Sequence, residues 1–375
     1  MKLKNTRRKI CFFLPHFFSG GLEKVVLNLI NNLNQDLYEP CLLLQDGNGD
    51  LLSRLNQNVV VYDLGGAKSS SGVFQLVSEL NKINPDIVYA GTHATNLMLL
   101  LAKAFVKDNF YTIISEHTPL ALLLSESKYS KIRVLLMRCL YRYADIFVAP
   151  VPEICTEHRE ILHLPEMSVK SLCNPVIPDV SEGLEKQARP EIFDRLTGPI
   201  FIAVGRLAAE KQFDLLIDSF ARVLETSPEA NLLILGEGAE RSSLEDKIRQ
   251  LNLTDKVHLI GNVENPFIYY PHCTLLLSCS KREGFGNVLV EAMSEGVPVV
   301  SMDCPFGPRN IIEDKRSGLL VPLNDENAFT EAIQWFLSNP QLHEQYSQAA
   351  KKISKAYTVS SAAEQFEEVC ASLHG

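Results

Sequence analysis

Two carboxylates eight residues apart form the most informative chemical pattern in the chain, in the segment Glu283-Gly-Phe-Gly-Asn-Val-Leu-Val-Glu291. The glycines at 284 and 286 permit a tight turn, and the residues after them have helical spacing. A helix that starts in such a turn directs backbone N–H groups at a ligand. The residues at this predicted helix start are Phe285, Gly286, Asn287 and Val288. The alternative is that Glu283 is a first-turn charge favoured by the helix dipole and Glu291 a solvated helix residue.

Two cations lie in a second pattern, Gly205-Arg206-Leu-Ala-Ala-Glu210-Lys211, directly after the apolar run Ile200–Val204. This places Arg206 and Lys211 at a strand end and a helix start, where the helix dipole disfavours positive charge. An anion between them would make the arrangement favourable, and a diphosphate has the required charge. The alternative is a pair of surface cations, with Lys211 paired to Asp214.

Glycine turns follow two further apolar runs and predict close contact with a ligand. Gly20 and Gly21 lie between the run Ile10–Leu14 and a helical stretch, without the G-x-G-x-x-G spacing of dinucleotide-binding proteins. Gly236 follows Leu232–Leu235, where it would suit contact with a nucleoside. Either glycine turn could instead be an ordinary connection between a strand and a helix.

Three histidines also follow apolar runs and are expected at strand ends, namely His16, His93 and His117. At that place they are candidates for contact with a bound ligand. The alternative for each is a hydrogen bond to a neighbouring loop.

The elements that must position these residues are short apolar runs alternating with amphipathic helical stretches. Runs of this length without apolar/polar alternation are typical of strands buried on both faces. The runs are Ile10–Leu14, Cys41–Leu44, Val59–Tyr62, Ile87–Ala90, Thr112–Ile114, Ile146–Ala149, then Ile200–Val204, Leu232–Leu235, Val257–Ile260, Leu275–Leu277, Val297–Val300 and Leu319–Val321. Strand–helix alternation predicts parallel sheets. The fold class is therefore α/β, with two Rossmann-like, doubly wound parallel-sheet domains.

A chain of 375 residues is long enough for two domains. Pro175 and Pro178 interrupt a polar stretch, so we expect an N-terminal domain over residues 1–177 and a second domain over residues 178–357. The last helix, within residues 358–375, follows a completed α/β domain and is expected to pack back on the first.

Composition limits the environment and the partners. Residues are 46% hydrophobic, and no apolar run reaches the roughly 18 residues of a membrane span. The apolar run after the basic N-terminus is too short for a signal peptide, and the nine cysteines include no C-x-x-C pair. These features favour a cytoplasmic protein with reduced thiols. A net charge of −9 argues against a nucleic-acid partner.

These motifs resemble those of glycosyltransferase family 4, retaining nucleotide-sugar transferases of the GT-B fold, in which two Rossmann-like domains face a cleft. The resemblance covers nearly the whole chain. It implies that the N-terminal domain (1–177) is the acceptor side, with His16 and His93 as acceptor candidates, and that the second domain (178–357) binds the donor. It implies that Arg206 and Lys211 hold the donor diphosphate and that Gly21 approaches it from the N-terminal domain. It also implies that Glu283 meets the sugar hydroxyls beside the reacting carbon and that Glu291 binds the ribose.

His117, in Ser115-Glu116-His117-Thr118, matches the active-site histidine position of this family. The family implies a metal-independent reaction, and no two aspartates in the chain have the D-x-D spacing of the other large transferase fold. No metal or other cofactor is expected beyond the donor substrate.

The resemblance suggests a UDP-sugar donor and a lipid-linked or cell-envelope glycan acceptor. The segment Asp303-Cys-Pro-Phe-Gly-Pro308 is similar to one in family members that transfer N-acetylhexosamines. A dinucleotide-dependent oxidoreductase is disfavoured because neither predicted sheet opens with G-x-G-x-x-G. A GT-B-type nucleotide-sugar epimerase and a non-catalytic nucleotide-sugar-binding protein remain as alternatives.

A basic stretch from Lys128 to Tyr143 predicts an amphipathic helix. Its apolar residues form one helical stripe, Ile132, Leu135, Leu136, Cys139 and Leu140. Such a helix could lie on an anionic membrane, which would place the protein peripherally on the inner face of the cell membrane. The alternative is a domain helix that buries this stripe and exposes a solvated basic face.

Overall fold

The chain divides into two compact α/β units in the computed structural model, which describes residues 7–66, 70–120, 130–165, 169–179 and 188–373. Unit 1 comprises residues 1–176 and 357–375, and unit 2 comprises residues 177–356. The division is adjacent to the one expected between residues 177 and 178. The prediction of two doubly wound parallel-sheet domains is confirmed.

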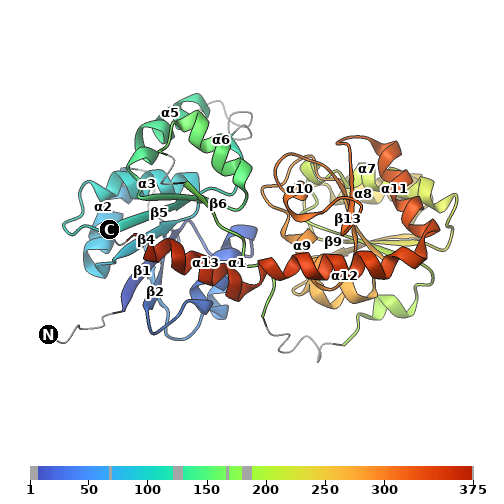
Figure 1. Ribbon diagram of the computed structural model, residues 1–375, viewed down its shortest axis with the longest axis horizontal. Helices are drawn as coiled ribbons and strands as arrows, with labels where there is room; N and C mark the ends of the chain where they lie inside the picture. The colour runs from blue at the N-terminus through green and yellow to red at the C-terminus, as the bar shows by residue number, and fades with distance from the viewer. Residues whose placement is uncertain (1–6, 67–69, 121–129, 166–168, 180–187, 374–375) are drawn as a thin grey trace. The chain divides into compact units, whose positions relative to one another are not determined.

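Unit 1 contains a seven-stranded parallel sheet in the order β3-β2-β1-β4-β5-β6-β7 (Figure 1). Its strands are β1 (Arg8–Leu14), β2 (Tyr38–Leu44), β3 (Val60–Asp63), β4 (Ile87–Ala90), β5 (Tyr111–Ser115), β6 (Ile146–Ala149) and β7 (Val169–Ser171). Phe12 of β1 pairs with Leu42 of β2 on one side and Tyr89 of β4 on the other. Successive residues of β1 therefore enter different core layers, Phe12 into one and Phe13 into the other.

Helices cover both faces of the unit 1 sheet. They are α1 (Gly21–Asn32), α2 (Ser70–Ile83), α3 (His93–Lys103), α5 (Ser130–Leu140), α6 (Pro152–Leu162) and α13 (Val359–Ala371), with the 3-10 turns η1 (Asp50–Arg54) and η2 (Tyr141–Tyr143). The C-terminal helix α13 packs beside α1, and Phe366 stacks on Phe12 with ring centroids 5.7 Å apart. The last helix of the chain thus completes the core of unit 1.

Unit 2 contains a six-stranded parallel sheet in the order β10-β9-β8-β11-β12-β13. Its strands are β8 (Ile200–Val204), β9 (Asn231–Leu235), β10 (Val257–Gly261), β11 (Leu275–Ser278), β12 (Val299–Met302) and β13 (Gly318–Val321). Its helices are α7 (Phe213–Leu224), α8 (Arg241–Gln250), α9 (Asn287–Ser294), α10 (Pro308–Ile311), α11 (Glu326–Ser338) and α12 (His343–Ser354). One continuous core lies between the sheet and α7, α8 and α11.

Strand β7 is the element that the sequence pattern misses. It has only three residues, Val169–Ser171, and each is half-buried or exposed at the sheet edge. An edge strand this short needs no apolar run, so nothing in the pattern distinguishes it from a loop.

Each sheet has one place where the strand order reverses, and this place positions the predicted site residues. Strand β1 lies between β2 and β4, and β8 lies between β9 and β11. Ligands of doubly wound proteins bind at such a point, outside the carboxyl ends of the strands. The loops that leave those ends carry Gly20 in unit 1 and Arg206, Lys211 and Glu283 in unit 2.

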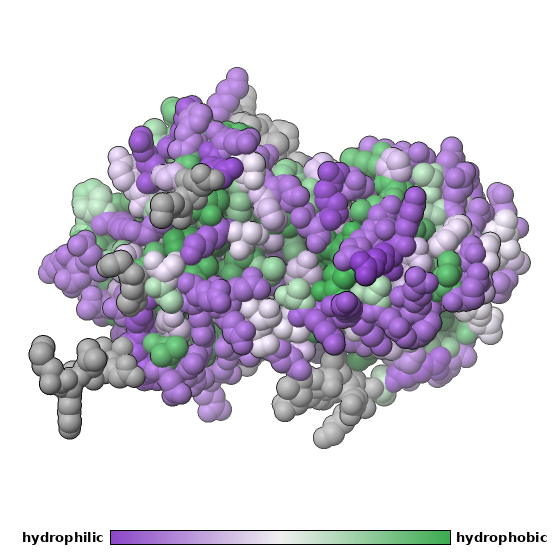
Figure 2. Space-filling view, viewed as in Figure 1, coloured by the Kyte–Doolittle hydropathy of each residue, from purple (hydrophilic) through white to green (hydrophobic). Residues whose placement is uncertain are grey.

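The face drawn in Figure 2 is mainly hydrophilic, with hydrophobic residues dispersed among polar ones. In the described parts of the chain, we find no helix long and apolar enough to cross a bilayer.

Candidate active site

The unit 2 site is assembled from loops at the carboxyl ends of four neighbouring strands, β9, β8, β11 and β12. The Gly205–Lys211 loop follows β8, and the loop with Glu283 follows β11. The two loops are joined by a backbone hydrogen bond from Lys281 N to Glu210 O, 2.8 Å. Residues about 70 positions apart in sequence therefore share one edge of the sheet.

Lys211 and Glu283 form the central contact of this site. Lys211 Nζ lies 2.5 Å from Glu283 Oε1, which also accepts a hydrogen bond from Ser280 Oγ at 2.7 Å. Both side chains are mostly buried. The alternative partner considered for Lys211, Asp214, is not the one observed. The cation of one predicted motif thus pairs with the carboxylate of the other.

Arg206 lies at the same strand end but is held differently. Its side chain is 73% exposed and pairs with Glu210, with Nη2 and Oε1 2.6 Å apart. An exposed pair four residues apart contributes little stability. Exchanging Glu210 for a bound anion would therefore cost the Arg206 guanidinium little free energy.

Gly236 holds two of these loops together. Its φ is +142°, and a Cβ at this position would lie 1.9 Å from the carbonyl oxygen of Gly205. Any side chain would thus push the loop after β9 away from the Gly205 loop. Gly236 is placed beside the candidate phosphate site, and packing within the chain already requires a glycine there.

The loop after β12 pairs with the loop that carries Glu283. Glu283 and Phe306 form a parallel bridge, and a Cβ at Gly307 would lie 2.2 Å from the Phe285 carbonyl oxygen. Phe306 has a φ of +79°, an unfavourable conformation for a bulky residue. The segment 303–308 thus packs directly against the loop that presents Glu283.

Helix α9 starts at the predicted place, with Gly286 (φ +103°) as its N-cap. Phe285 is buried, and Asn287 and Val288 form the half-buried first turn. Because Gly286 has no side chain, it cannot cap the N–H groups of this turn. The geometry is that of a helix start able to face an anion.

Glu291 lies about one turn inside α9 and is held by a buried tyrosine. The hydroxyl of Tyr270 donates to Glu291 Oε2 at 2.8 Å, and Tyr270 is fully buried. Burial raises the pKa of Tyr270, so it stays a neutral donor. Glu291 therefore has a fixed orientation, unlike a solvated helix residue.

In unit 1, Gly20 is the N-cap of α1 and Gly21 its first residue. A Cβ at Gly20 would lie 2.2 Å from Glu23 Oε2. Apart from its chain neighbours and the backbone of its own helix, no atom of the described chain lies within 4 Å of a Cβ built at Gly21. Packing inside the protein thus gives no reason for glycine at position 21. His16 is close by, with Nδ1 3.6 Å from Glu23 Oε1.

His117 and His93 follow neighbouring strands, β5 and β4. His117 Nε2 lies 3.0 Å from Ser115 Oγ, and burial lowers the pKa of His117 to about 4, so the ring is neutral near pH 7. His93 is the first residue of α3, and burial together with the charge of Arg133 lowers its pKa. Since β1, β4 and β5 are adjacent, all three histidines leave the same edge of the unit 1 sheet.

Several polar residues in these sites carry no signal strong enough to single them out from sequence. Ser280 and Tyr270 contact the two key glutamates, and Asn96, Glu116 and Tyr141 form a buried cluster beside His117. The position of Glu116 directly before His117 is the one signal that could have drawn attention to it.

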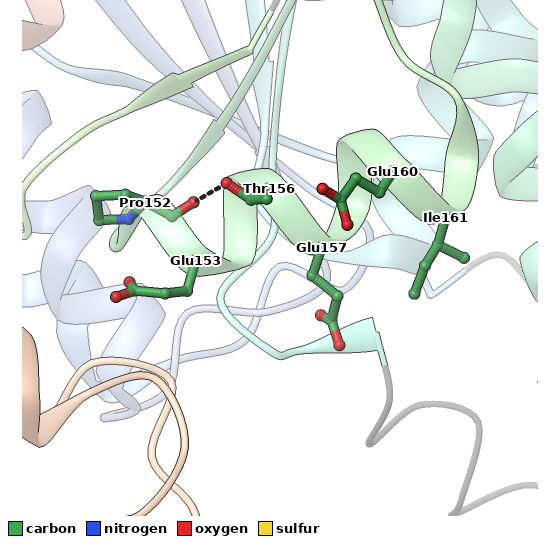
Figure 3. Close-up of a pocket in the computed structure, with 6 residues that line it drawn as sticks. All are labelled: Pro152, Glu153, Thr156, Glu157, Glu160 and Ile161. Atoms are coloured by element: carbon green, nitrogen blue, oxygen red, sulfur yellow. Dashed lines mark hydrogen bonds between the residues drawn. The ribbon is translucent and has the colours of Figure 1, made fainter.

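A pocket of about 390 Å³ lies along α6, and none of the predicted site residues line it (Figure 3). Its walls are Pro152, Glu153, Thr156, Glu157, Glu160 and Ile161. Three carboxylates would repel a diphosphate, so this pocket is not the donor site. Across the described residues, no group of three or more His, Cys, Asp or Glu side chains is placed to hold a metal ion.

Comparison with known proteins identifies the family. The model of "Glycosyltransferase Family 4" matches residues 19–180, and that of "Glycosyl transferases group 1" matches residues 185–353. Each match covers most of one unit.

Individual relatives agree with these matches. An uncharacterized glycosyltransferase of Methanocaldococcus jannaschii is 33% identical over 256 residues, which span 64% of this chain and 61% of that protein. N-acetylgalactosamine-N,N'-diacetylbacillosaminyl-diphospho-undecaprenol 4-alpha-N-acetylgalactosaminyltransferase of Campylobacter jejuni is 27% identical, over 93% of this chain and 96% of the relative.

The crystal structure of Anabaena HepE in complex with UDP-glucose has the same fold, with a TM-score of 0.81 and 20% identity, over 98% of this chain and all of that one. The chain is a glycosyltransferase and belongs to the family 4-like group of the GT-B fold.

Proposed function

We propose that the protein is a retaining, metal-independent glycosyltransferase that moves a sugar from a UDP-sugar to a lipid-linked or cell-envelope glycan. The observation that carries the proposal is the Lys211–Glu283 pair at the carboxyl edge of the unit 2 sheet. It brings a cation suited to a diphosphate within 2.5 Å of a carboxylate suited to sugar hydroxyls. The roles of the individual residues come from the family resemblance.

The donor and acceptor classes rest on the relatives. HepE has been crystallised with UDP-glucose, and the Campylobacter enzyme is named for transferring N-acetylgalactosamine to a diphospho-undecaprenol glycan. N-acetylhexosamine is the narrower proposal for the sugar. It is supported by the Asp303–Pro308 segment, which packs against the Glu283 loop.

In this proposal, the transfer step depends on stabilising the negative charge of the leaving diphosphate. The bond between the anomeric carbon and the diphosphate oxygen breaks, and the acceptor oxygen bonds to that carbon on the same face. The acceptor proton goes to the departing diphosphate. Arg206, Lys211 and the α9 N–H groups stabilise the charge that develops on the leaving group, and preorganised groups of this kind have large catalytic effects.

Helix α5 carries the second part of the proposal, that the enzyme acts at the cytoplasmic face of an anionic membrane. Ile132, Leu135 and Leu136 of the predicted stripe are 60%, 59% and 47% exposed, whereas Met137 is buried. The alternative that this stripe is domain core is therefore wrong for the described part of the helix; residues 128 and 129 lie outside it. Exposed Lys131, Arg138 and Arg142 accompany the stripe. An exposed apolar face beside cations suits an anionic membrane surface.

The roles of the two glutamates are tested by Glu283→Gln and Glu291→Gln. Glu283→Gln should lower kcat by at least about a hundred-fold, because an oriented carboxylate beside the reacting carbon acts mainly in the transition state. UDP affinity should not fall, since Lys211 loses a competing carboxylate. Glu291→Gln should mainly weaken UDP binding. Steady-state kinetics and titration calorimetry measure both, with Glu264→Gln, an exposed carboxylate of unit 2, as the matched control.

Exchanged phenotypes, or wild-type turnover by Glu283→Gln, would contradict these roles. Release of an altered nucleotide sugar without any acceptor would identify the protein as an epimerase instead.

Transfer should persist in excess EDTA, because Arg206, Lys211 and the α9 start are proposed to neutralise the leaving group without a metal. The measurement is sugar transfer before and after chelation, beside a manganese-dependent transferase that loses activity in the same buffer. Loss of transfer that Mn²⁺ or Mg²⁺ restores would refute metal independence.

Sedimentation with anionic vesicles tests the role of α5. The wild type should pellet with them and be released by salt, since each cation near such a surface contributes about 1 kcal/mol. Replacement of Lys131, Arg133, Arg138 and Arg142 by serine should leave the protein in the supernatant. The control, with the same charge change, replaces Arg195, Arg249, Lys352 and Lys355, which are exposed in unit 2. If the wild type stays in the supernatant, the α5 surface does not bind membranes.

A further inference from the structure

Glu116 is a carboxylate that is only 4% exposed, and the mechanism above gives it no role. Its Oε1 accepts hydrogen bonds from the hydroxyl of Tyr141 and from Asn96 Nδ2, the latter at 3.0 Å. Tyr141 belongs to η2, directly after α5, and Asn96 belongs to α3. One carboxylate oxygen thus joins three segments: α3, η2 and the end of β5.

The backbone around Glu116 is fixed by the same neighbours. Asn96 Nδ2 also donates to the carbonyl oxygen of Ser115 at 2.9 Å, and Glu116 N donates to Val148 O of β6 at 3.1 Å. Asn96 and Tyr141 are themselves buried. The peptide that leads into His117 is therefore held on both sides, and its position depends on this cluster.

The His117 ring is oriented by the neighbouring hydroxyl of Ser115, 3.0 Å from Nε2. Tyr89 of β4 is fully buried and lies beside Ser115. Ring and backbone of this short loop are thus both fixed by buried polar groups, as expected for a side chain that must be held in one geometry.

We propose that Glu116 is a positioning residue for the transfer reaction: through Asn96 and Tyr141 it holds the β5 loop so that His117 stays in its working orientation. The inference rests on the proposed function, in which His117 contacts the reacting substrates. To hold Asn96 and Tyr141, Glu116 needs only an acceptor oxygen at the position of Oε1. The negative charge of the carboxylate is not required.

The titration of Glu116 supplies a readout that is independent of activity. Burial raises the pKa of Glu116 to about 7, against the lowering effect of the Tyr141 and Asn96 hydrogen bonds. The other titratable groups facing it are Tyr89 from β4 and Tyr141 from η2, with His117 in its own loop. Burial keeps all three neutral near pH 7.

A raised carboxyl pKa means that the folded state retains a proton that the unfolded state has lost. The contribution of Glu116 to the stability of the wild type should therefore fall as pH rises from about 4.5 to about 7 and then level off.

The test compares Glu116→Ala, Glu116→Gln and the control Glu160→Gln, an exposed carboxylate of α6. Glu116→Ala should lower kcat by about ten- to a hundred-fold, the range expected when a reacting group is misplaced. Glu116→Gln keeps the acceptor oxygen and should stay within about three-fold of the wild type. UDP affinity should be unchanged in all three. Between pH 5 and pH 8 the Tm of Glu116→Gln should rise relative to those of the wild type and of Glu160→Gln.

Tyr141→Phe provides a second variant if Glu116→Ala does not fold. It keeps the ring and removes one hydrogen bond, so kcat should fall several-fold at unchanged UDP affinity. Wild-type kcat in Glu116→Ala or Tyr141→Phe would overturn the positioning role. So would a Glu116→Gln variant as inactive as Glu116→Ala, because the charge itself would then be required. A wild type that transfers no sugar while the Tm differences appear would refute the proposed function but leave the cluster intact.

Discussion

Both sheets are parallel, and this arrangement determines which residues of each unit can meet. In a parallel sheet every strand ends at the same edge, so residues far apart in sequence leave the sheet close together. Strand β8 has β9 on one side and β11 on the other, and β1 has β2 and β4. The Gly205–Lys211 loop and the Glu283 loop meet for this reason, as do the loops that carry His16, His93 and His117.

Charge then distinguishes the two edges. At the unit 2 edge, the Lys211–Glu283 pair is mostly buried, while the Arg206–Glu210 pair lies on the surface. A buried pair holds its geometry because leaving either member alone is costly. A surface ion pair breaks at little cost in free energy. The site thus combines a fixed carboxylate and ammonium group with a guanidinium that can change partners. The unit 1 edge carries neutral His117 and the glycine turn of Gly20 and Gly21 instead.

Much of this could be predicted from the sequence, since buried parallel strands leave continuous apolar runs. Twelve such runs correspond to twelve strands. Glu283, Arg206 and Lys211 lie at the sheet edge as expected, and Glu291 lies about one turn inside α9. Strand β7 has no apolar run, and the partners Ser280, Tyr270 and Asn96 come from distant segments whose approach only the fold reveals. The α5 stripe shows the limit of periodicity, which identifies an apolar face but not whether that face is buried. Only the structure shows that Ile132 and Leu135 of this face are exposed.

Titration of UDP into the wild type, Arg206→Ala, Lys211→Ala and the exposed-cation control Arg249→Ala measures whether Arg206 and Lys211 hold a nucleotide diphosphate. A charged hydrogen bond contributes about 1.5–3 kcal/mol, so each site variant should bind UDP at least about ten-fold more weakly, while the control binds like the wild type. Wild-type UDP affinity in both Arg206→Ala and Lys211→Ala would contradict the account.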